Sequence, residues 1–153
     1  MKLISYFFSS IFAFVFFLSL VVFHPLQWIG LKIGYQSHKN VVDILNWILT
    51  KSLLIIGNTV HFKVTHPIPD NSTIIFVANH QGLFDIPPII WYLRKYHSKF
   101  VSKIELGKGI PSISFNLKHG GAALINRKDP KQALTEIKEF GQRVHKNKWS
   151  ATI

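Results

Sequence analysis

The chain has 153 residues, of which 48% are hydrophobic and 16% charged, and its formal net charge is +11. A chain of this length forms one small domain at most, and the high hydrophobic content excludes a disordered protein. Because the sequence contains no cysteine, disulfides and thiolate metal sites are excluded as well.

Residues 3–23 form an apolar run without a charged side chain. As a helix this run is about 32 Å long, which is enough to cross a hydrocarbon core of about 30 Å. A cleaved signal peptide is the alternative, but residues 23–27 (Phe-His-Pro-Leu-Gln) lack a small-x-small cleavage site. We therefore expect an uncleaved membrane helix.

Residues 41–56 form a second apolar stretch, interrupted at helical spacing by Asp43, Asn46, Thr50 and Lys51. The pattern predicts an amphipathic helix that lies in the membrane interface or packs back on the first helix. A core helix of the following domain is the alternative. We expect residues 1–60 to anchor the chain to a membrane and, since lysines lie mainly after residue 32, the remainder to stay on the cytoplasmic face.

A histidine and an aspartate follow the apolar run 73–78, which is rich in β-branched residues and predicts a buried strand. Asn79 and His80 come directly after this run, and Asp85 follows five residues after His80. Near pH 7 a neutral imidazole is a good general base, and an aspartate at its far nitrogen fixes the tautomer. On a helix the two side chains would lie about 140° apart, so they meet only if the chain bends, which Gly82 permits.

A histidine–aspartate pair of this kind can catalyse transfer of an acyl group directly from one substrate to the other. The sequence has no cysteine and no Gly-x-Ser-x-Gly motif, so a covalent nucleophile is not indicated. The histidine would take a proton from a substrate hydroxyl, which then attacks an acyl carbonyl. The alternative interpretation makes Asp85 the N-cap of a helix that contains Pro87 and Pro88, with His80 a polar loop residue.

Helices and strands are expected to alternate over the rest of the chain, at 87–96 (helix), 99–104 (strand), 109–119 (helix), 122–125 (strand) and from 149 (strand). The helix from Pro130 to about Lys146 has the clearest start, because Asp129 can act as its N-cap. Glu139 and Arg143 should pair on its exposed side. Its expected apolar stripe consists of Leu134, Ile137, Phe140 and Val144. This order of elements predicts an α/β fold, a sheet layered with helices.

Most of the positive charge lies after residue 60. Anionic lipid headgroups and substrate phosphates are the expected partners, whereas nucleic acid is not, because no nucleic-acid-binding motif is present. No metal is expected either, since the eight histidines form no metal-ligand pair. Apart from His80 they are interpreted as structural or surface residues: His24, His38, His61, His66, His97, His119 and His145.

Three segments together resemble a known family. Asn79-His80, followed by Asp85, is similar to the first signature block of the glycerolipid acyltransferases, which include the 1-acylglycerol-3-phosphate acyltransferases. Residues 100–106 resemble the segment between the first and second blocks, and residues 121–127 (Gly-Ala-Ala-Leu-Ile-Asn-Arg) the second block, with leucine in place of the usual aromatic residue. The resemblance covers residues 73–153.

The resemblance implies roles for particular residues. His80 would be the general base and Asp85 the residue that orients it, while Arg127 and Lys103 would bind the phosphate of the acceptor. The other substrate-binding positions carried over from the motifs are Asn79 and Gly121. The implied reaction moves a fatty acyl group from acyl-CoA or acyl-carrier protein to 1-acylglycerol-3-phosphate (lysophosphatidate), forming phosphatidate in phospholipid biosynthesis, without a cofactor. Another lysophospholipid or glycerol phosphate is the alternative acceptor.

The family's third block, Phe-Pro-Glu-Gly-Thr-Arg, is not found in the sequence. Residues 149–153 look like the start of the strand that precedes it. We therefore expect residues 61–153 to be the N-terminal part of an acyltransferase domain, truncated before the third block. The alternative is a non-catalytic, membrane-anchored lipid-binding remnant.

Overall fold

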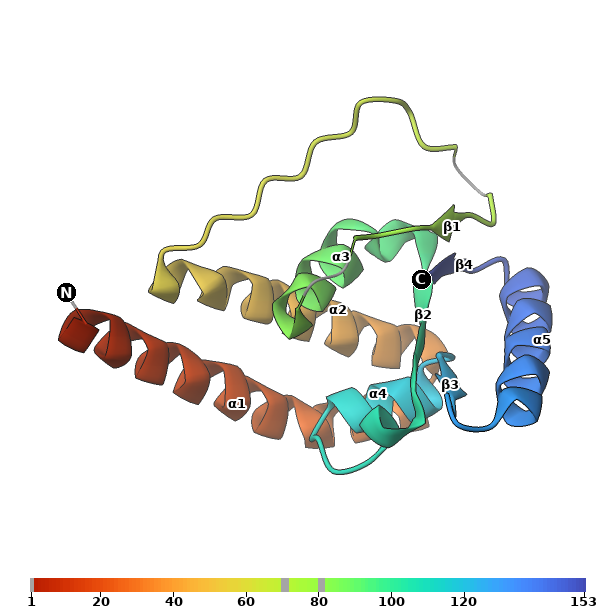
Figure 1. Ribbon diagram of the computed structural model, residues 1–153, viewed down its shortest axis with the longest axis horizontal. Helices are drawn as coiled ribbons and strands as arrows, with labels where there is room; N and C mark the ends of the chain where they lie inside the picture. Colours follow the sequence, from red (N-terminus) through yellow and green to blue (C-terminus); the bar gives the residue numbers. More distant parts are fainter. Residues whose placement is uncertain (1, 70–71, 80–81) are drawn as a thin grey trace.

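The computed structural model describes residues 2–69, 72–79 and 82–153, which form a pair of long helices and a parallel sheet flanked by shorter helices (Figure 1). Helices α1 (Lys2–Ile33) and α2 (Tyr35–Ser52) run side by side in opposite directions, and a 3-10 turn, η1 (Leu53–Ile56), continues α2. The chain reverses at Gly34, whose φ of 149° suits glycine and strains other residues. One glycine is therefore enough to close the helical hairpin.

Helix α1 confirms that the N-terminal apolar run is helical and extends it to Ile33. It is the one helix in the described part of the chain that is long and apolar enough to cross a membrane, with a mean hydropathy of 2.4 over 18 residues. Only 17% of that segment is buried, so most of its apolar side chains are exposed. The buried face packs on α2 and η1 in a core formed by Phe12, Phe16, Leu20, Leu45, Leu49 and Leu53.

Helix α2 packs back on α1, which is one of the two expected arrangements, but part of its expected polar side is buried. Asn46 and Thr50 are each only 6% exposed. Their side chains are satisfied within the helix, because Asn46 Nδ2 donates to the carbonyl of Val42 and Thr50 Oγ1 to that of Asn46, both at 2.7 Å. Ile44 and Trp47 are 50% and 42% exposed instead. The expected apolar residues Val42, Leu45, Leu49 and Leu53 are buried as well, so α2 buries part of its polar side in addition to its apolar side, and Ile44 and Trp47 stay open.

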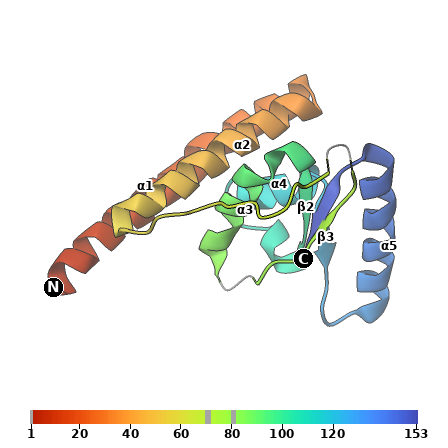
Figure 2. The ribbon, with the colours of Figure 1, turned by 90° about the horizontal axis from the view of Figure 1, so that it is seen from above.

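The α/β fold expected from the sequence is confirmed. Strands β1 (Ile75–Phe76), β2 (Ser98–Lys103), β3 (Ala123–Ile125) and β4 (Ser150–Thr152) form one parallel sheet in the order β1-β4-β2-β3. The connections contain α3 (Ile86–Tyr92), α4 (Ile113–His119) and α5 (Pro130–Asn147), together with the 3-10 turns η2 (Leu83–Asp85), η3 (Arg94–Tyr96) and η4 (Ile104–Gly107). Helix α5 covers one face of the sheet, while α3 and α4 lie between the other face and the α1–α2 hairpin (Figure 2).

Helix α5 starts at the expected residue. Only part of its expected apolar stripe is buried against the sheet. Phe140 and Val144 are buried against Ala123 and Ala151 of the sheet. Leu134 and Ile137 were expected in the same core, but they are 71% and 46% exposed. The physical reason is the length of the strands beneath them, since β3 and β4 have three residues each and end before the first turns of α5.

Two further expectations need correction. The strand expected over residues 73–78 is limited to Ile75–Phe76, and it is not buried, since Ile75 is 65% exposed. It lies at the edge of the sheet and pairs only with β4, which leaves its outer side uncovered. The helix expected over residues 109–119 begins at Ile113, because Ser112 has a φ of 59° and its Oγ donates to the carbonyl of Leu20 in α1 at 2.6 Å.

Candidate active site

The expected site residues lie mainly at one edge of the sheet. Because the strands are all parallel, their C-terminal ends meet there, and ligands of open α/β sheets bind at this edge. Asn79 follows β1, Lys103 ends β2 and Arg127 follows β3, and all three are exposed. The edge is tied together across β1 and β4, because the N–H of Ala78 donates to the carbonyl of Ile153 at 3.1 Å.

His80, the expected general base, lies outside the described residues. Its expected partner, Asp85, is described and closes a short loop. Asp85 Oδ2 accepts a hydrogen bond from the N–H of Gly82 at 2.9 Å, and the N–H of Asp85 donates to the carbonyl of Gly82 at 3.1 Å. These reciprocal bonds hold the Asp85 carboxylate against the backbone of Gly82.

The alternative role of Asp85, as the N-cap of the following helix, is confirmed for its position but not for a side-chain contact. Asp85 occupies the N-cap position of α3, but its side chain makes no capping hydrogen bond to that helix. The carboxylate instead faces back to Gly82, whose backbone is extended, with a φ of −155°.

The same loop is attached to α1 through Phe84, the residue before Asp85. The Phe84 ring lies 5.2 Å from that of Phe12 and 5.5 Å from that of Phe16, in edge-to-face geometry with interplanar angles of 74° and 84°. Sequence reasoning missed this contact, and the only signal for it was an aromatic residue directly beside the motif aspartate. The apolar N-terminal helix therefore helps to position the motif.

A hydrogen-bonded turn positions Arg127. Asp129 Oδ1 accepts from the N–H groups of Lys131 and Gln132 at 3.1 Å each, which confirms its role as the N-cap of α5. Gln132 reaches back to the turn itself, because its Oε1 accepts from the N–H of Asn126 at 2.8 Å and its Nε2 donates to the carbonyl of Leu124 at 3.1 Å. The backbone on both sides of Arg127 is thus held in place.

The two expected phosphate-binding residues are neighbours, but the motif loop is farther away. Lys103 pairs in register with Ile125, two residues before Arg127. Within the part of the chain that the structure describes, no carboxylate pairs with Lys103 or Arg127. Strand β1 lies at the opposite edge from β3, three strand spacings or about 14 Å away. A ligand held by the motif loop and by Arg127 must therefore extend across the ends of β4 and β2.

Gly121, expected to bind substrate, is not at this edge. It precedes β3 and so lies at the N-terminal edge of the sheet. Its φ is 95°, and a Cβ at this position would lie 2.7 Å from the Trp149 ring. The glycine is therefore required by the backbone and by its contact with Trp149, and the structure does not bring it together with Lys103 and Arg127.

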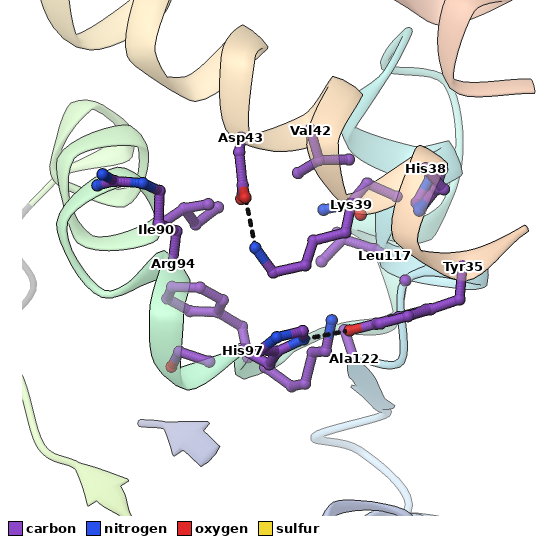
Figure 3. A pocket seen from close by; sticks show the side chains of 15 residues that line it. Tyr35, His38, Lys39, Val42, Asp43, Ile90, Arg94, His97, Leu117 and Ala122 are labelled. Carbon is purple, nitrogen blue, oxygen red and sulfur yellow. Dashed lines mark hydrogen bonds and ion pairs between the residues drawn. The ribbon is translucent and has the colours of Figure 1, made fainter. Parts of the chain in front are cut away.

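A polar cavity at the N-terminal edge was missed by sequence reasoning. Its walls carry Tyr35, Lys39 and Asp43 from α2, His97 from the end of η3 and Lys99 from the start of β2 (Figure 3). Lys39 and Asp43 form an ion pair, and the Tyr35 hydroxyl is 3.1 Å from Nδ1 of His97. The spacing of residues 35, 39 and 43 on one side of α2 was the available signal.

Burial changes the ionisation of this cluster. It lowers the pKa of His97 to about 4, with the charges of Lys39 and Lys99 as further causes. Burial also raises the pKa of the Tyr35 hydroxyl and of the Asp43 carboxyl, and the Lys39 charge opposes the shift at Asp43. At neutral pH the histidine is therefore neutral and can accept the hydrogen bond from Tyr35.

No group of three or more histidine and acidic side chains in the described ranges could hold a metal ion. A parallel sheet with polar loops at the C-terminal ends of its strands defines an α/β domain of the kind that enzymes use for binding and catalysis. A family model described as Acyltransferase matches residues 59–153, more than half of the chain, so the chain belongs to the acyltransferase family. No curated protein matches the chain, and no solved structure does.

Proposed function

We propose that the protein transfers a fatty acyl group from acyl-CoA or acyl-carrier protein to 1-acylglycerol-3-phosphate, forming phosphatidate. The observation that carries the proposal is the placement of the motif loop and of two cations, Lys103 and Arg127, at the same edge of the sheet in a member of the acyltransferase family. Neither cation pairs with a carboxylate among the described residues. Acyl transfer to a glycerolipid-type substrate is the reaction that this family membership supports.

The proposed step is a direct displacement at a thioester. His80 takes the proton of the free glycerol hydroxyl, and the oxygen attacks the acyl carbonyl as the new ester bond forms. The carbon–sulfur bond then breaks, and the proton on His80 passes to the leaving thiolate. Asp85 holds the imidazole in the required tautomer and stabilises its protonated form between the two transfers.

Lys103 and Arg127 are proposed to bind the phosphate of the acceptor. An arginine offers a fork of N–H donors to phosphate oxygens and a lysine offers a point charge. Their position on adjacent strands allows one phosphate to contact both. Asn79 is exposed next to His80 and is proposed to hydrogen-bond the substrate.

The α1–α2 hairpin is proposed to hold the α/β domain on a membrane. The open side of α1 exposes large apolar side chains, including Phe14 (66%) and Phe17 (59%). The other side is held to the α/β domain by polar contacts, since the N–H of Ser112 donates to His24 Nδ1 at 3.1 Å and its Oγ donates to the carbonyl of Leu20. This favours a hairpin lying in the cytoplasmic membrane face with the domain beside it over a helix that crosses the bilayer alone.

The test uses membranes from cells that express the protein from its complete gene. We expect formation of phosphatidate from lysophosphatidate and acyl-CoA, and a loss of at least about a hundredfold in the His80→Ala variant at equal protein level. His61→Ala, which changes an exposed histidine outside the motif, is the matched control. Near wild-type turnover in His80→Ala would exclude the proposed base.

The acceptor is tested separately with Arg127→Ala. We expect a higher KM for lysophosphatidate and an unchanged KM for the acyl donor, because only the acceptor phosphate contacts Arg127. Equal rates with lysophosphatidate, lysophosphatidylcholine and glycerol 3-phosphate would contradict the proposed acceptor while leaving acyl transfer in place.

A further inference from the structure

The cavity at the N-terminal edge of the sheet is separate from the proposed active site. It lies between the start of α2, the end of α4 and the first residues of β2 (Figure 3). Lys99 of this cavity and Lys103 of the proposed active site are four residues apart on one strand, or about 13 Å. A ligand in the cavity therefore cannot share these two lysines.

The cavity is electropositive. Three basic side chains, Lys39, Arg94 and Lys99, line it with a single carboxylate, that of Asp43. The carboxylate is paired with Lys39. Arg94 is held by Trp91, whose carbonyl accepts from Nη1 at 2.8 Å and whose ring lies 3.9 Å from the guanidinium carbon. Of these three cations, Lys99 is the one whose charged group contacts no oxygen acceptor among the described residues.

Within the described ranges, the ammonium group of Lys99 contacts aromatic rings and no hydrogen-bond acceptor. Its Nζ lies 4.6 Å from the centre of the Trp149 ring and 5.0 Å from that of Tyr35, and these two rings stack on each other at 5.2 Å. Aromatic faces attract the charge but accept none of its three N–H bonds in the ordinary way. Among the described residues no oxygen accepts from Nζ. Burial, followed by the charge of Lys39, lowers the pKa of Lys99 to about 8, so most of this group is still protonated at pH 7.

A second polar atom in the cavity wall also lacks a partner. His38 is 1% exposed, and its Nε2 has no hydrogen-bond partner within the described ranges. Both His38 and Tyr35 belong to the first turn of α2, whose dipole adds positive potential at this end of the helix. Buried polar atoms without partners are rare, and a site with several of them is a site that a polar ligand can complete.

The size of the cavity restricts the ligand. Its volume is about 50 Å³. One water needs roughly 10–15 Å³ by this measure, so the space suits a few waters or one small polar group and excludes an acyl chain. An oxyanion is the group that can accept hydrogen bonds in several directions from a lysine and a histidine.

We propose that this cavity binds a single phosphate group, with the ammonium of Lys99 as its main ligand and Nε2 of His38 as a further hydrogen-bond donor. The phosphate belongs to the headgroup of an anionic phospholipid or to a free phosphate compound. When bound, it links α2 to the start of β2 and so fastens the helical hairpin to the sheet. The proposal does not depend on the proposed acyltransferase reaction.

The first experiment measures binding of inorganic phosphate to the purified chain in detergent, against chloride at the same ionic strength. We expect phosphate to raise the midpoint of thermal unfolding of the wild type. Lys99→Met, which keeps the apolar stem, should weaken phosphate binding by about tenfold or more. Lys138→Met on the exposed side of α5 is the matched control and should bind phosphate as the wild type does. Equal binding by Lys99→Met would overturn the proposal.

A second measurement needs no variant and covers the case in which Lys99→Met does not fold. The wild type is treated with an amine-specific reagent, and labelling of each lysine is read by mass spectrometry with and without phosphate. We expect phosphate to protect Lys99 and to leave Lys138 unchanged. Unchanged labelling of Lys99 at saturating phosphate would contradict the proposed site.

Vesicles then distinguish the two sources of phosphate. Vesicles of phosphatidylcholine alone are compared with vesicles that also contain phosphatidate. If the site takes a lipid headgroup, phosphatidate should protect Lys99, and Lys99→Met should bind the mixed vesicles more weakly than Lys138→Met does. Protection by inorganic phosphate alone assigns the site to a free phosphate compound, and protection by neither probe excludes it.

Discussion

Asp85 is proposed to serve two purposes with one carboxylate. Its Oδ2 fixes the loop by accepting from the N–H of Gly82, and its charge is proposed to orient His80. Asp85→Asn separates the two, because an amide oxygen can still accept from Gly82 whereas the charge is lost. We expect the thermal midpoint to change little and kcat for acyl transfer to fall by at least about a hundredfold. A variant that keeps kcat within a few-fold of wild type would show that the carboxylate does not support the base.

Two histidines make stability depend on pH. Burial, followed by nearby positive charge, lowers the pKa values of His38 and His97 to about 4, from an ordinary value of 6.5. Between these values the unfolded chain binds more protons than the folded one, so the free energy of unfolding falls as the pH falls from 6.5 to 4. Each group contributes at most about 1.4 kcal/mol per pH unit, and the partly exposed His97 less. Asp43, whose pKa burial raises, offsets part of this loss.

The measurement is the thermal midpoint of the chain in detergent at about pH 7 and about pH 5. We expect a lower midpoint at the lower pH. His97→Asn is the informative variant, because asparagine tolerates the left-handed backbone at this position, where φ is 48°. It removes one titrating group, so the midpoint should depend less on pH. A wild-type midpoint that rises on acidification would contradict the assignment.

At the scale of single elements, Phe84 couples the motif loop to α1. Phe84→Ala removes two edge-to-face contacts, to Phe12 and Phe16, each worth about 0.5–1.5 kcal/mol beyond burial. We expect a lower thermal midpoint and a lower kcat with little change in KM, and recovery of both in Phe84→Trp. If Phe84 acts by positioning Asp85, adding Phe84→Ala to Asp85→Asn should reduce kcat no further. Independent, multiplying losses in the double variant would contradict a positioning role.

Elements with strong local signals were predicted well. Asp129 and Pro130 begin α5 because capping and a fixed proline φ act within one turn, and Glu139 pairs with Arg143 at 3.8 Å as expected. Predictions failed where the partner lies far away in sequence. Leu134 is exposed because β3 and β4 are short, and Asn46 is buried because α1 and the α/β domain cover that side of α2. No periodicity in either helix carries this information.

The candidate site likewise divides into features set by local sequence and features set by contacts between distant segments. The motif residues and Arg127 were found from local pattern, and the parallel order of the strands explains why most of them lie at one edge. Gly121 lies at the other edge, and its positive φ and contact with Trp149 show that a motif glycine can serve the backbone; its substrate role stays a prediction. The cavity around Lys99 could not be predicted, since it is assembled from α2, α4 and β2 and depends on how the hairpin packs on the domain.

At the scale of the whole molecule, the close approach of α1 and α2 depends on Gly30. A Cβ at Gly30 would lie 3.1 Å from the Cα of His38, which is backbone and cannot rotate away. Gly141 in α5 is the matched position, because a Cβ there meets no atom within 4 Å. Both glycines lie within helices, where alanine is favoured over glycine by about 0.8–1.0 kcal/mol. Gly141→Ala should therefore raise the thermal midpoint.

Gly30→Val should instead lower the thermal midpoint, because the larger side chain forces the two helices apart at the end where His38 and Tyr35 line the cavity. Opening the hairpin there would expose Lys99, so we expect faster labelling of this lysine by an amine-specific reagent and normal labelling in Gly141→Ala. Protection of Lys99 by phosphate should be lost in Gly30→Val as well. If Gly30→Val kept both the midpoint and the Lys99 labelling rate of the wild type, the hairpin would not depend on this contact, and the cavity would form without tight packing of α2 on α1.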